Sequence, residues 1–359
     1  MLLTPGPVHV PKRLLFPQRE LMHHRSREFR EFYSSVMGML EEISGAENAV
    51  VLSGSGTLAT ESIFASGSLG KVLVASNGVF GRRLFEIASL YCDASIAEFP
   101  EGKGINYPRL REKAGLGEFD SVAIVENETS TCCMNDVKSI ARNFGGEIIV
   151  DSVSCWPVGN VSARDVSAIA TASQKCIGIA PGISIVFLAH GKADSLLLKK
   201  PRSYYADLAR NISSYRMKGE TLCTPAVTLL YSLHDSLDAI LESGLGAFVA
   251  KHEAMASKAR KMLLEAGFEL MAENGFESRT VTGFLCGSPE EKNFIKSELA
   301  SKGFSIASGK GIFSGNGLRI GTMGFFEEEK VLEALELIAG ARADFRVGEM
   351  AVSAVSRQT

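Results

Sequence analysis

The segment GGEIIVDSVSCWPVGNVSARDVSAIATASQKCIGIAPGISIVFLAH, residues 145–190, carries the strongest information on the fold. It contains three short apolar runs, at 148–150, 168–170 and 183–188, which are bounded by Gly, Ser or Asp. Such runs are typical of strands that are covered on both faces of a sheet. The first run ends in Asp151 and the second leads to Lys175, so charged side chains follow directly on two apolar strands.

The same pattern continues towards the N-terminus. Apolar runs alternate there with stretches of helical periodicity. The runs lie at 49–52, 72–75 and 122–125, and the helical stretches at 58–66, 82–90 and 136–143. This alternation predicts an α/β domain with a mostly parallel sheet.

The chain beyond residue 190 predicts a second, smaller unit. Its helical stretches are 225–241, 246–266, 289–302 and 327–339, and its strands lie near 279–285 and 317–320. This mixture indicates a small α+β domain, and a length of 359 residues favours two domains. We predict a large domain over 15–245 and a small domain over 246–359 that also includes segment 1–14.

Composition excludes several classes of protein. A net charge of −3 gives no reason to expect nucleic acid or an anionic membrane as a partner. The seven cysteines form no paired C-x2-C motif, so we expect no metal site and reduced thiols. Pro5, Pro7 and Pro11 interrupt the N-terminal apolar stretch, and no run of about 18 apolar residues could span a bilayer. We therefore expect a soluble, cytoplasmic protein.

The residues that follow each predicted strand are informative because ligands bind beyond the carboxyl ends of strands in an open parallel sheet. The run 49–52 leads into Ser-Gly-Ser-Gly-Thr at 53–57, and a glycine-rich turn that opens a helix can bind an anion such as phosphate. A flexible turn without a ligand is the alternative. The turn is not a P-loop, and the next strand ends in 75–77 without the acid that a dinucleotide ribose requires.

Asp151 and Lys175 suggest the chemistry. A carboxylate that ends an apolar strand requires a cation, such as a protonated pyridine nitrogen, unless Asp151 caps the next turn. Lys175 lies in a segment of small and apolar residues, where desolvation would lower its pKa and favour a Schiff-base role. A lysine that extends to solvent is the alternative.

Two other strand ends suit a planar ligand. Phe80, in a loop between Gly78 and Gly81, could stack on an aromatic ring or could cap the core. The hydroxyls of 129–131 could donate to a ring substituent, or they could form the N-cap of the helix near Asp136.

Together these segments resemble the class V, fold-type I, pyridoxal-phosphate-dependent aminotransferases, and in particular the alanine–glyoxylate and serine–pyruvate branch. The resemblance covers nearly the whole chain. The segments that carry it are 4–7, 53–57, 128–131, 150–154, 173–175, 224–225 and 318–321. It implies a large domain built on a mostly parallel, seven-stranded sheet and a smaller C-terminal α+β domain.

The resemblance also implies pyridoxal 5′-phosphate as the cofactor, held as a Schiff base on Lys175, with Asp151 paired to its pyridinium nitrogen. Lys175 would then move the proton between the substrate and the cofactor. The remaining residues implied to bind the cofactor are Ser55, Gly56, Thr57 and Gln174 at the phosphate, Val153 and Phe80 at the two ring faces, Thr129 near the ring hydroxyl, and Thr224 from the neighbouring subunit.

Arg319 is implied to bind the substrate α-carboxylate as a bidentate fork, and Gly6 is assigned to the substrate site with it. A surface arginine on an edge strand is the alternative for Arg319. The implied reaction is ping-pong transamination between a small amino acid, such as alanine or serine, and a 2-oxo acid, such as glyoxylate or pyruvate. Phosphoserine, 2-aminoethylphosphonate or aspartate are alternative substrates. Because Thr224 would act across subunits, the resemblance implies a homodimer with the active site at the subunit interface.

The chain departs from the family pattern in places. Phe80 replaces the usual Tyr or Trp, and Cys132 replaces a usual glycine, where it could narrow the pocket. Thr221 stands where some relatives have an aromatic phosphate ligand. Residues 23–26, His-His-Arg-Ser, could form a substrate-access segment or a solvated helix start.

Two other classes of function are compatible with a similar scaffold. A lyase such as a cysteine desulfurase or kynureninase is one, but a desulfurase needs a cysteine in a mobile loop, and Cys286 ends a predicted strand. A non-catalytic binding protein is the other. The combination of Lys175, Asp151 and Arg319 argues against it.

Overall fold

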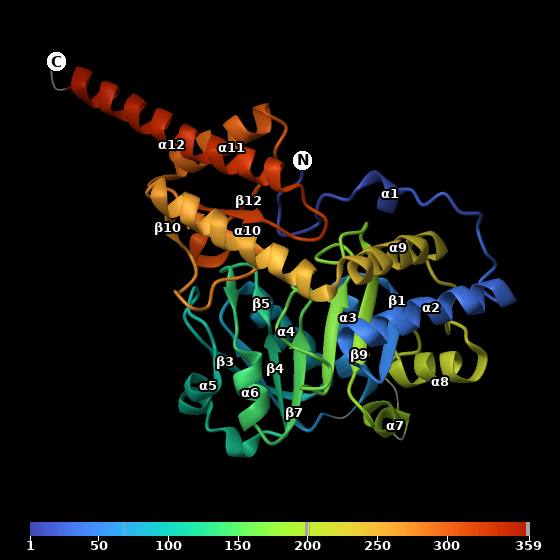
Figure 1. The fold of residues 1–359 in the computed structure, drawn as a ribbon. Helices are drawn as coiled ribbons and strands as arrows, with labels where there is room; N and C mark the ends of the chain where they lie inside the picture. The colour runs from blue at the N-terminus through green and yellow to red at the C-terminus, as the bar shows by residue number, and fades with distance from the viewer. Residues whose placement is uncertain (68, 198–199, 201, 357–359) are drawn as a thin grey trace.

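The computed structural model describes residues 1–67, 69–197, 200 and 202–356, and it is built on two main sheets (Figure 1). The larger sheet has seven strands in the order β1-β9-β8-β7-β4-β2-β3. Only β9 runs antiparallel to its neighbours, which confirms the mostly parallel sheet. Its strands are β1 (Asn48–Gly54), β2 (Lys71–Ser76), β3 (Asp93–Glu98), β4 (Ser121–Val125), β7 (Glu147–Asp151), β8 (Ala168–Ala172) and β9 (Gly182–Leu188).

Each buried strand of this sheet contributes side chains to two hydrophobic cores, one on each face, which explains the continuous apolar runs. In β7, Ile148 and Val150 belong to one core cluster, whereas Ile149 lies in the other. Successive side chains of a strand point to opposite faces, so both faces require apolar residues. The sheet is therefore the middle layer of three.

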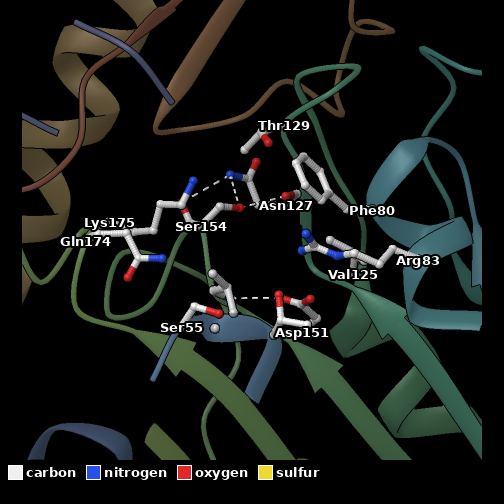
Figure 2. A pocket seen from close by; sticks show the side chains of 13 residues that line it. Ser55, Phe80, Arg83, Val125, Asn127, Thr129, Asp151, Ser154, Gln174 and Lys175 are labelled. Carbon is white, nitrogen blue, oxygen red and sulfur yellow. Dashed lines mark hydrogen bonds between the residues drawn. The ribbon is translucent and has the colours of Figure 1, made fainter. Parts of the chain in front are cut away.

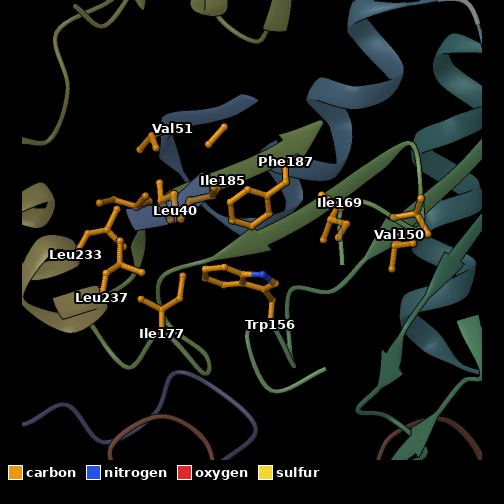
Figure 3. Close-up of a cluster of buried hydrophobic side chains, with 14 of the residues drawn as sticks. Leu40, Val51, Val150, Trp156, Ile169, Ile177, Ile185, Phe187, Leu233 and Leu237 are labelled. Carbon is orange, nitrogen blue, oxygen red and sulfur yellow. The ribbon is translucent and has the colours of Figure 1, made fainter. Parts of the chain in front are cut away.

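Helices on both faces complete the layers (Figure 1). One face packs against α2 (Arg27–Ser44), α5 (Tyr107–Ala114), α6 (Val137–Asn143) and α9 (Val227–Ser243). The other packs against α3 (Gly56–Ser66), α4 (Val79–Tyr91), α7 (Lys192–Leu197) and α8 (Leu208–Lys218). Figure 3 shows the first core, where the rings of Trp156 and Phe187 lie 4.7 Å apart beside Leu233 and Leu237.

The smaller sheet is antiparallel, with the strand order β10-β11-β13-β12. Its elements are α10 (Leu245–Glu265), β10 (Glu269–Leu270), β11 (Val281–Leu285), α11 (Pro289–Ser301), β12 (Ala307–Ser308), β13 (Gly317–Gly321) and α12 (Glu328–Ser356). The N-terminal segment joins it, because the N–H of Leu3 donates to the carbonyl of Ser305 at 2.8 Å. These contacts support the predicted division into 15–245 and 246–359 with 1–14, which stays a prediction.

The remaining short elements are α1 (Lys12–Leu15), the paired strands β5 (Asn127–Glu128) and β6 (Cys133–Met134), and two short 3-10 helices, η1 (Leu116–Glu118) and η2 (Gly311–Phe313). Several elements differ from the sequence prediction. Strand β3 was not predicted, since it is an edge strand with polar residues and has no long apolar run. Helix α8 was also missed, and α12 continues past the predicted end at 339 to Ser356.

The two sheets meet directly behind the segment that carries Lys175. Gly178, with φ +76°, follows Lys175 in a turn, and Gly324, with φ +68°, follows β13. A Cβ atom on Gly324 would lie 2.8 Å from the Cα of Gly178. Since so short a contact admits no side chain, the two backbones pack against each other.

No helix in the described part of the chain combines the length and the apolarity needed to cross a membrane.

Candidate active site

One edge of the large sheet holds the predicted site. Strands β1, β2, β4, β7 and β8 are parallel, so their carboxyl ends lie at the same edge. A cavity of about 240 Å³ opens there (Figure 2). The predicted residues that line it are Ser55, Gly56, Thr57, Phe80, Thr129, Asp151, Val153, Gln174 and Lys175. The structure therefore brings these nine together, while Gly6, Arg319 and Thr224 lie outside the lining.

The N-terminus of α3 forms one wall of the cavity. Ser55 is the N-cap residue, but its side chain makes no capping hydrogen bond. A Cβ atom on Gly56 would lie 2.6 Å from a methyl group of Val153, so this turn requires glycine. Free N–H groups at a helix start attract an anion. Across the turn, the buried Oε1 of Gln174 has no hydrogen-bond partner among the described residues.

Asp151 ends β7 with a buried carboxylate. Its Oδ1 accepts a hydrogen bond from the N–H of Val153 at 3.0 Å, and its Oδ2 accepts from the hydroxyl of Thr60 at 3.5 Å. Asp151 therefore caps the turn, as the alternative prediction proposed, and also faces the cavity. Burial raises the pKa of its carboxyl group above 3.8, and no basic side chain within the described ranges forms an ion pair with it. A cation in the cavity would relieve this cost.

Lys175 follows β8 and reaches the cavity through its side chain. The amine donates to the carbonyl of Pro5. Burial lowers the pKa of the amine from 10.5 to about 8, with the positive charges of Arg319 and Arg83 adding to the effect. Lys175 is thus not a surface lysine that extends to solvent. A lowered pKa leaves more of the amine neutral and nucleophilic.

Gly6 lies against the amine of Lys175 rather than in the cavity wall. Its φ of +108° is unusual for a residue with a side chain, and a Cβ atom there would lie 2.5 Å from the Nζ of Lys175. The N-terminal motif 4–7 therefore covers the lysine. Its predicted contact with substrate stays a prediction.

Phe80 lines the cavity but does not lie in a loop. It occupies the first turn of α4, so the predicted loop position is wrong. The N–H groups of Phe80 and Gly81 donate to Oε2 of the buried Glu128 at 3.0 and 2.9 Å. This buried carboxylate stabilises the helix start, and it explains why a helix begins without an Asn, Asp, Ser or Thr cap. Stacking of Phe80 on a ligand ring stays a prediction.

Thr129 and Arg319 connect the two sheets at the cavity. Arg319 donates to the carbonyl of Thr129 at 2.7 Å from Nη1 and to the carbonyl of Ser308 at 3.0 Å from Nε. It is 5% exposed and lies on β13, an inner strand of the small sheet, so the surface alternative is wrong. The helix near 136 is capped by Asp136 itself, which excludes that role for the hydroxyls of 129–131.

Thr224 is exposed and lies in a separate surface hollow with Thr221 and Tyr205. Its contact with a cofactor of a second subunit stays a prediction. Ser26 is the N-cap of α2, and Arg25 donates to Glu220 at 2.5 Å, which supports the helix-start alternative for 23–26.

Cys132 does not narrow the cavity. It is buried between the two sheets and is absent from the lining. Its φ is +59°, a backbone conformation that glycine adopts at little cost and other residues rarely adopt. This conformation would suit the glycine that the resemblance leads us to expect at this place.

Sequence reasoning missed four residues in the lining, namely Arg83, Val125, Asn127 and Ser154. Asn127 donates to the hydroxyl of Ser154 at 3.0 Å, while its own buried Oδ1 has no partner among the described residues. Its position two residues after the end of β4 was a usable signal, because strand ends at this edge point to the site. Arg83 gave no signal, since it follows the similar Arg82 on a helix.

The lining fits a flat, cationic ring that carries a phosphate group. An anion would find free N–H groups at the start of α3, and a positive ring nitrogen would meet the unpaired carboxylate of Asp151. An amine of lowered pKa lies in the same cavity to meet a carbonyl carbon. These are the features by which an enzyme holds pyridoxal 5′-phosphate.

Comparison with known proteins agrees with this geometry. The chain is 30% identical to an uncharacterised aminotransferase of Methanocaldococcus jannaschii, over 94% of this chain and 91% of the relative. It is 28% identical to a 2-aminoethylphosphonate–pyruvate transaminase of Pseudomonas aeruginosa, over 98% of each chain.

Two solved structures have a similar fold. An aspartate aminotransferase of Thermus thermophilus matches 96% of this chain and 99% of its own, with a TM-score of 0.85 and 28% identity. An alanine–glyoxylate aminotransferase of a Nostoc species covers 95% of this chain and 94% of its own, with a TM-score of 0.86 and 23% identity. No family model matches the chain.

Proposed function

The chain belongs to the class V pyridoxal-phosphate-dependent aminotransferases, and on this premise we propose that it moves an amino group between a small α-amino acid and a 2-oxo acid. The proposed donor resembles alanine or serine, and the proposed acceptor resembles glyoxylate or pyruvate. One observation carries the proposal: an amine with a pKa of about 8 and a buried, unpaired carboxylate share one cavity.

We propose that pyridoxal 5′-phosphate binds in this cavity. The cofactor supplies an electron-withdrawing ring and a carbonyl carbon that combines with amines. Ser55, Gly56, Thr57 and Gln174 would bind its phosphate. Asp151 would keep the ring nitrogen protonated, Val153 and Phe80 would enclose the ring, and Thr129 would contact the ring hydroxyl.

Lys175 has two proposed tasks. Its amine would anchor the cofactor before substrate arrives, and it would afterwards carry a proton between the substrate α-carbon and the carbon of the cofactor that had been its carbonyl carbon. Each task requires a neutral amine, since an ammonium group is neither a nucleophile nor a base. A pKa of about 8 gives a neutral share roughly 300 times larger than a pKa of 10.5 does near neutral pH.

We predict that the rate of cofactor binding to the apoenzyme rises with pH and levels off above about pH 8. Below this pH Lys175 is mostly protonated and cannot attack the cofactor carbonyl. The visible absorbance that develops after mixing apoenzyme with pyridoxal 5′-phosphate measures this rate. The Lys175→Ala variant is the control, and it should show no pH-dependent step of this kind. A midpoint near 10.5 would contradict the lowered pKa.

Arg319 is proposed to bind the substrate α-carboxylate with the part of its guanidinium group that makes no backbone contact. Its Nε and Nη1 are held by the carbonyls of Ser308 and Thr129, so the fork is fixed before substrate binds.

We expect Arg319→Ala to raise KM for α-amino acids by about 10²-fold, because a charge-assisted contact to the carboxylate is lost. Steady-state kinetics with the best donor measures this change. Arg342→Ala is a matched control, since Arg342 is also a buried arginine of the small unit but pairs with Glu291. An unchanged KM in Arg319→Ala would show that substrate binds elsewhere.

A desulfurase is less well supported. Cys286 is buried at the end of β11 and is not part of the cavity lining, and burial raises the pKa of its thiol to about 12. A thiol of this kind is a poor nucleophile.

We also propose a homodimer in the cytoplasm. An exposed Thr224 outside the cavity supports a role towards a second subunit, and the exposed apolar side chains of Phe16, Leu21 and Met217 suit an interface. All seven cysteines are unpaired, as expected in a reducing compartment.

Half-reactions test the proposed function most directly. The cofactor-loaded enzyme is mixed with each standard amino acid, and the loss of visible absorbance and the keto acid formed are followed. We expect conversion with at least one small amino acid. Release of sulfide from cysteine without keto acid would instead support the lyase alternative.

A further inference from the structure

Two basic side chains beside Phe80 bind neither the cofactor nor the substrate in the function proposed above. Arg83, on α4, holds its guanidinium carbon 4.7 Å from the centre of the Phe80 ring. Lys310, from the small unit, holds its amine 5.0 Å from the same centre. Arg83 lines the cavity, and Lys310 reaches the ring of Phe80, which lines it as well.

Neither cation is in contact with an acidic side chain in the described part of the chain. Arg83 and Lys310 form no ion pair or side-chain hydrogen bond there, whereas the preceding Arg82 contacts both Glu98, at 3.1 Å, and Glu101, at 2.8 Å. Two buried carboxylates lie near these cations. Glu128 acts on Lys310, but its oxygens already accept from the N–H groups of Phe80, Gly81 and Ser130. Burial raises the pKa of Asp151 and the charge of Arg83 opposes that rise, although the two side chains form no ion pair. Arg82 is therefore engaged in ion pairs within the protein, whereas Arg83 can contact an anionic group in the cavity.

The contacts that these cations make with Phe80 are weak. A cation over a phenyl ring contributes less than a charge-assisted hydrogen bond to an anion. An anionic group that entered the cavity would therefore draw both side chains from the ring. Burial lowers the pKa of Lys310, and the nearby positive charges of Arg319 and Arg83 lower it further.

The position of Lys310 relates it to the substrate rather than to the cofactor phosphate. The carbonyl of Ser308, two residues earlier, accepts the hydrogen bond from Arg319, so Lys310 follows the proposed α-carboxylate clamp. The N–H of Ile312 donates to Glu101 at 2.9 Å, which holds this segment over the large sheet. Ser55 and Gln174, at the proposed phosphate position, lie on the opposite side of the cavity from Arg83 and Phe80 (Figure 2).

We propose that Arg83 and Lys310 form a subsite for a second anionic group on the substrate, so that the preferred substrates are short amino acids and 2-oxo acids with an acidic side chain. This inference rests on the proposed aminotransferase function and moves its preferred donor from an alanine- or serine-like amino acid to a short acidic one. The shared chemistry is a carboxylate or a phosphate group a few bonds from the α-carbon. Arg319 binds one end of such a substrate, and Arg83 and Lys310 bind the other.

The test compares pairs of donors that differ in this charge. Aspartate is compared with asparagine, and phosphoserine with serine, by kcat/KM in the wild type and in Arg83→Gln, Lys310→Gln and Lys302→Gln. Alanine reports basal transamination. Lys302 is an exposed lysine of the same unit with no part in the site, so it controls for net charge.

We expect the wild type to favour the acidic member of at least one pair by about 10- to 100-fold, as charge-assisted hydrogen bonds imply. A preference for aspartate identifies a carboxylate and a preference for phosphoserine identifies a phosphate, and either supports the subsite. Arg83→Gln and Lys310→Gln should each reduce the preference by about 10-fold, and alanine turnover should change little in Lys310→Gln. Arg83→Gln also removes a charge that acts on Lys175 and Asp151, so its readout is the ratio of kcat/KM between the acidic and the neutral donor. Arg83→Lys should restore part of the preference.

Turnover of alanine without any preference for the acidic donors would overturn the subsite and leave the proposed function intact. An equal decrease in kcat/KM with alanine and with aspartate in Arg83→Gln would also overturn the subsite, because Arg83 would then act through Asp151 or the cofactor. No turnover with any amino donor would overturn the proposed function itself.

Discussion

Replacing Lys175 with alanine is expected to lower the rate of transamination by about 10⁴-fold, the upper range for loss of a group that transfers a proton in the rate-limiting step. The side chain is the amine of lowered pKa in the cavity, and no other lysine lines that cavity within the described ranges. The cofactor phosphate contacts do not involve Lys175, so the variant should still bind pyridoxal 5′-phosphate, but reversibly.

Two controls make this result specific. Lys302→Ala removes an exposed lysine and should leave activity unchanged. Added methylamine should restore part of the activity of Lys175→Ala, because a free amine can enter the vacated volume and carry the proton. Full activity in Lys175→Ala would refute the assignment of this lysine.

Replacing Asp151 with asparagine is expected to lower kcat by about 10²- to 10³-fold, as for other losses of one electrostatic contact to a reacting group. Asparagine keeps the size of the side chain and can still accept from the N–H of Val153. It cannot keep a ring nitrogen protonated, so electron withdrawal by the ring is lost.

The same substitution should not destabilise the apoprotein. Burial raises the pKa of folded Asp151 above 3.8, so the folded chain binds this proton more tightly than the unfolded chain. Stability therefore falls as pH rises from about 4 towards the raised pKa, and the asparagine of the variant, which does not titrate, would not contribute to that fall. Thermal unfolding of apoprotein at neutral pH should give a Tm that is equal to or above that of the wild type. Asp93→Asn, at an exposed position, is the matched control, and a large decrease in Tm for Asp151→Asn alone would contradict this reasoning.

Much of the large sheet could be predicted because a strand that is buried on both faces leaves a continuous apolar run. The runs ending before Asp151 and leading to Lys175 are of this kind, and the parallel direction of their strands placed both side chains at one edge. Strand β3 could not be predicted in this way, since it lies at the edge of the sheet and alternates polar with small residues.

The rest of the site depends on tertiary contacts that leave no local signal. Arg82 and Arg83 are adjacent on one helix, and only the position of Glu98 and Glu101 distinguishes the paired residue from the free one. Lys310 reaches Phe80 from more than 200 residues away in sequence. The left-handed backbone conformation of Cys132 could not be predicted from the sequence either, because cysteine rarely adopts it and the residue type gives no indication of it.

The bare contact between Gly178 and Gly324 sets how closely the two sheets can approach beside Lys175. A methyl group added at either glycine would push the two backbones apart. Gly178 lies three residues beyond Lys175, and Gly324 lies three residues beyond the end of β13, which carries Arg319. The spacing between the amine and the guanidinium group is thus set in part by two residues that have no side chain.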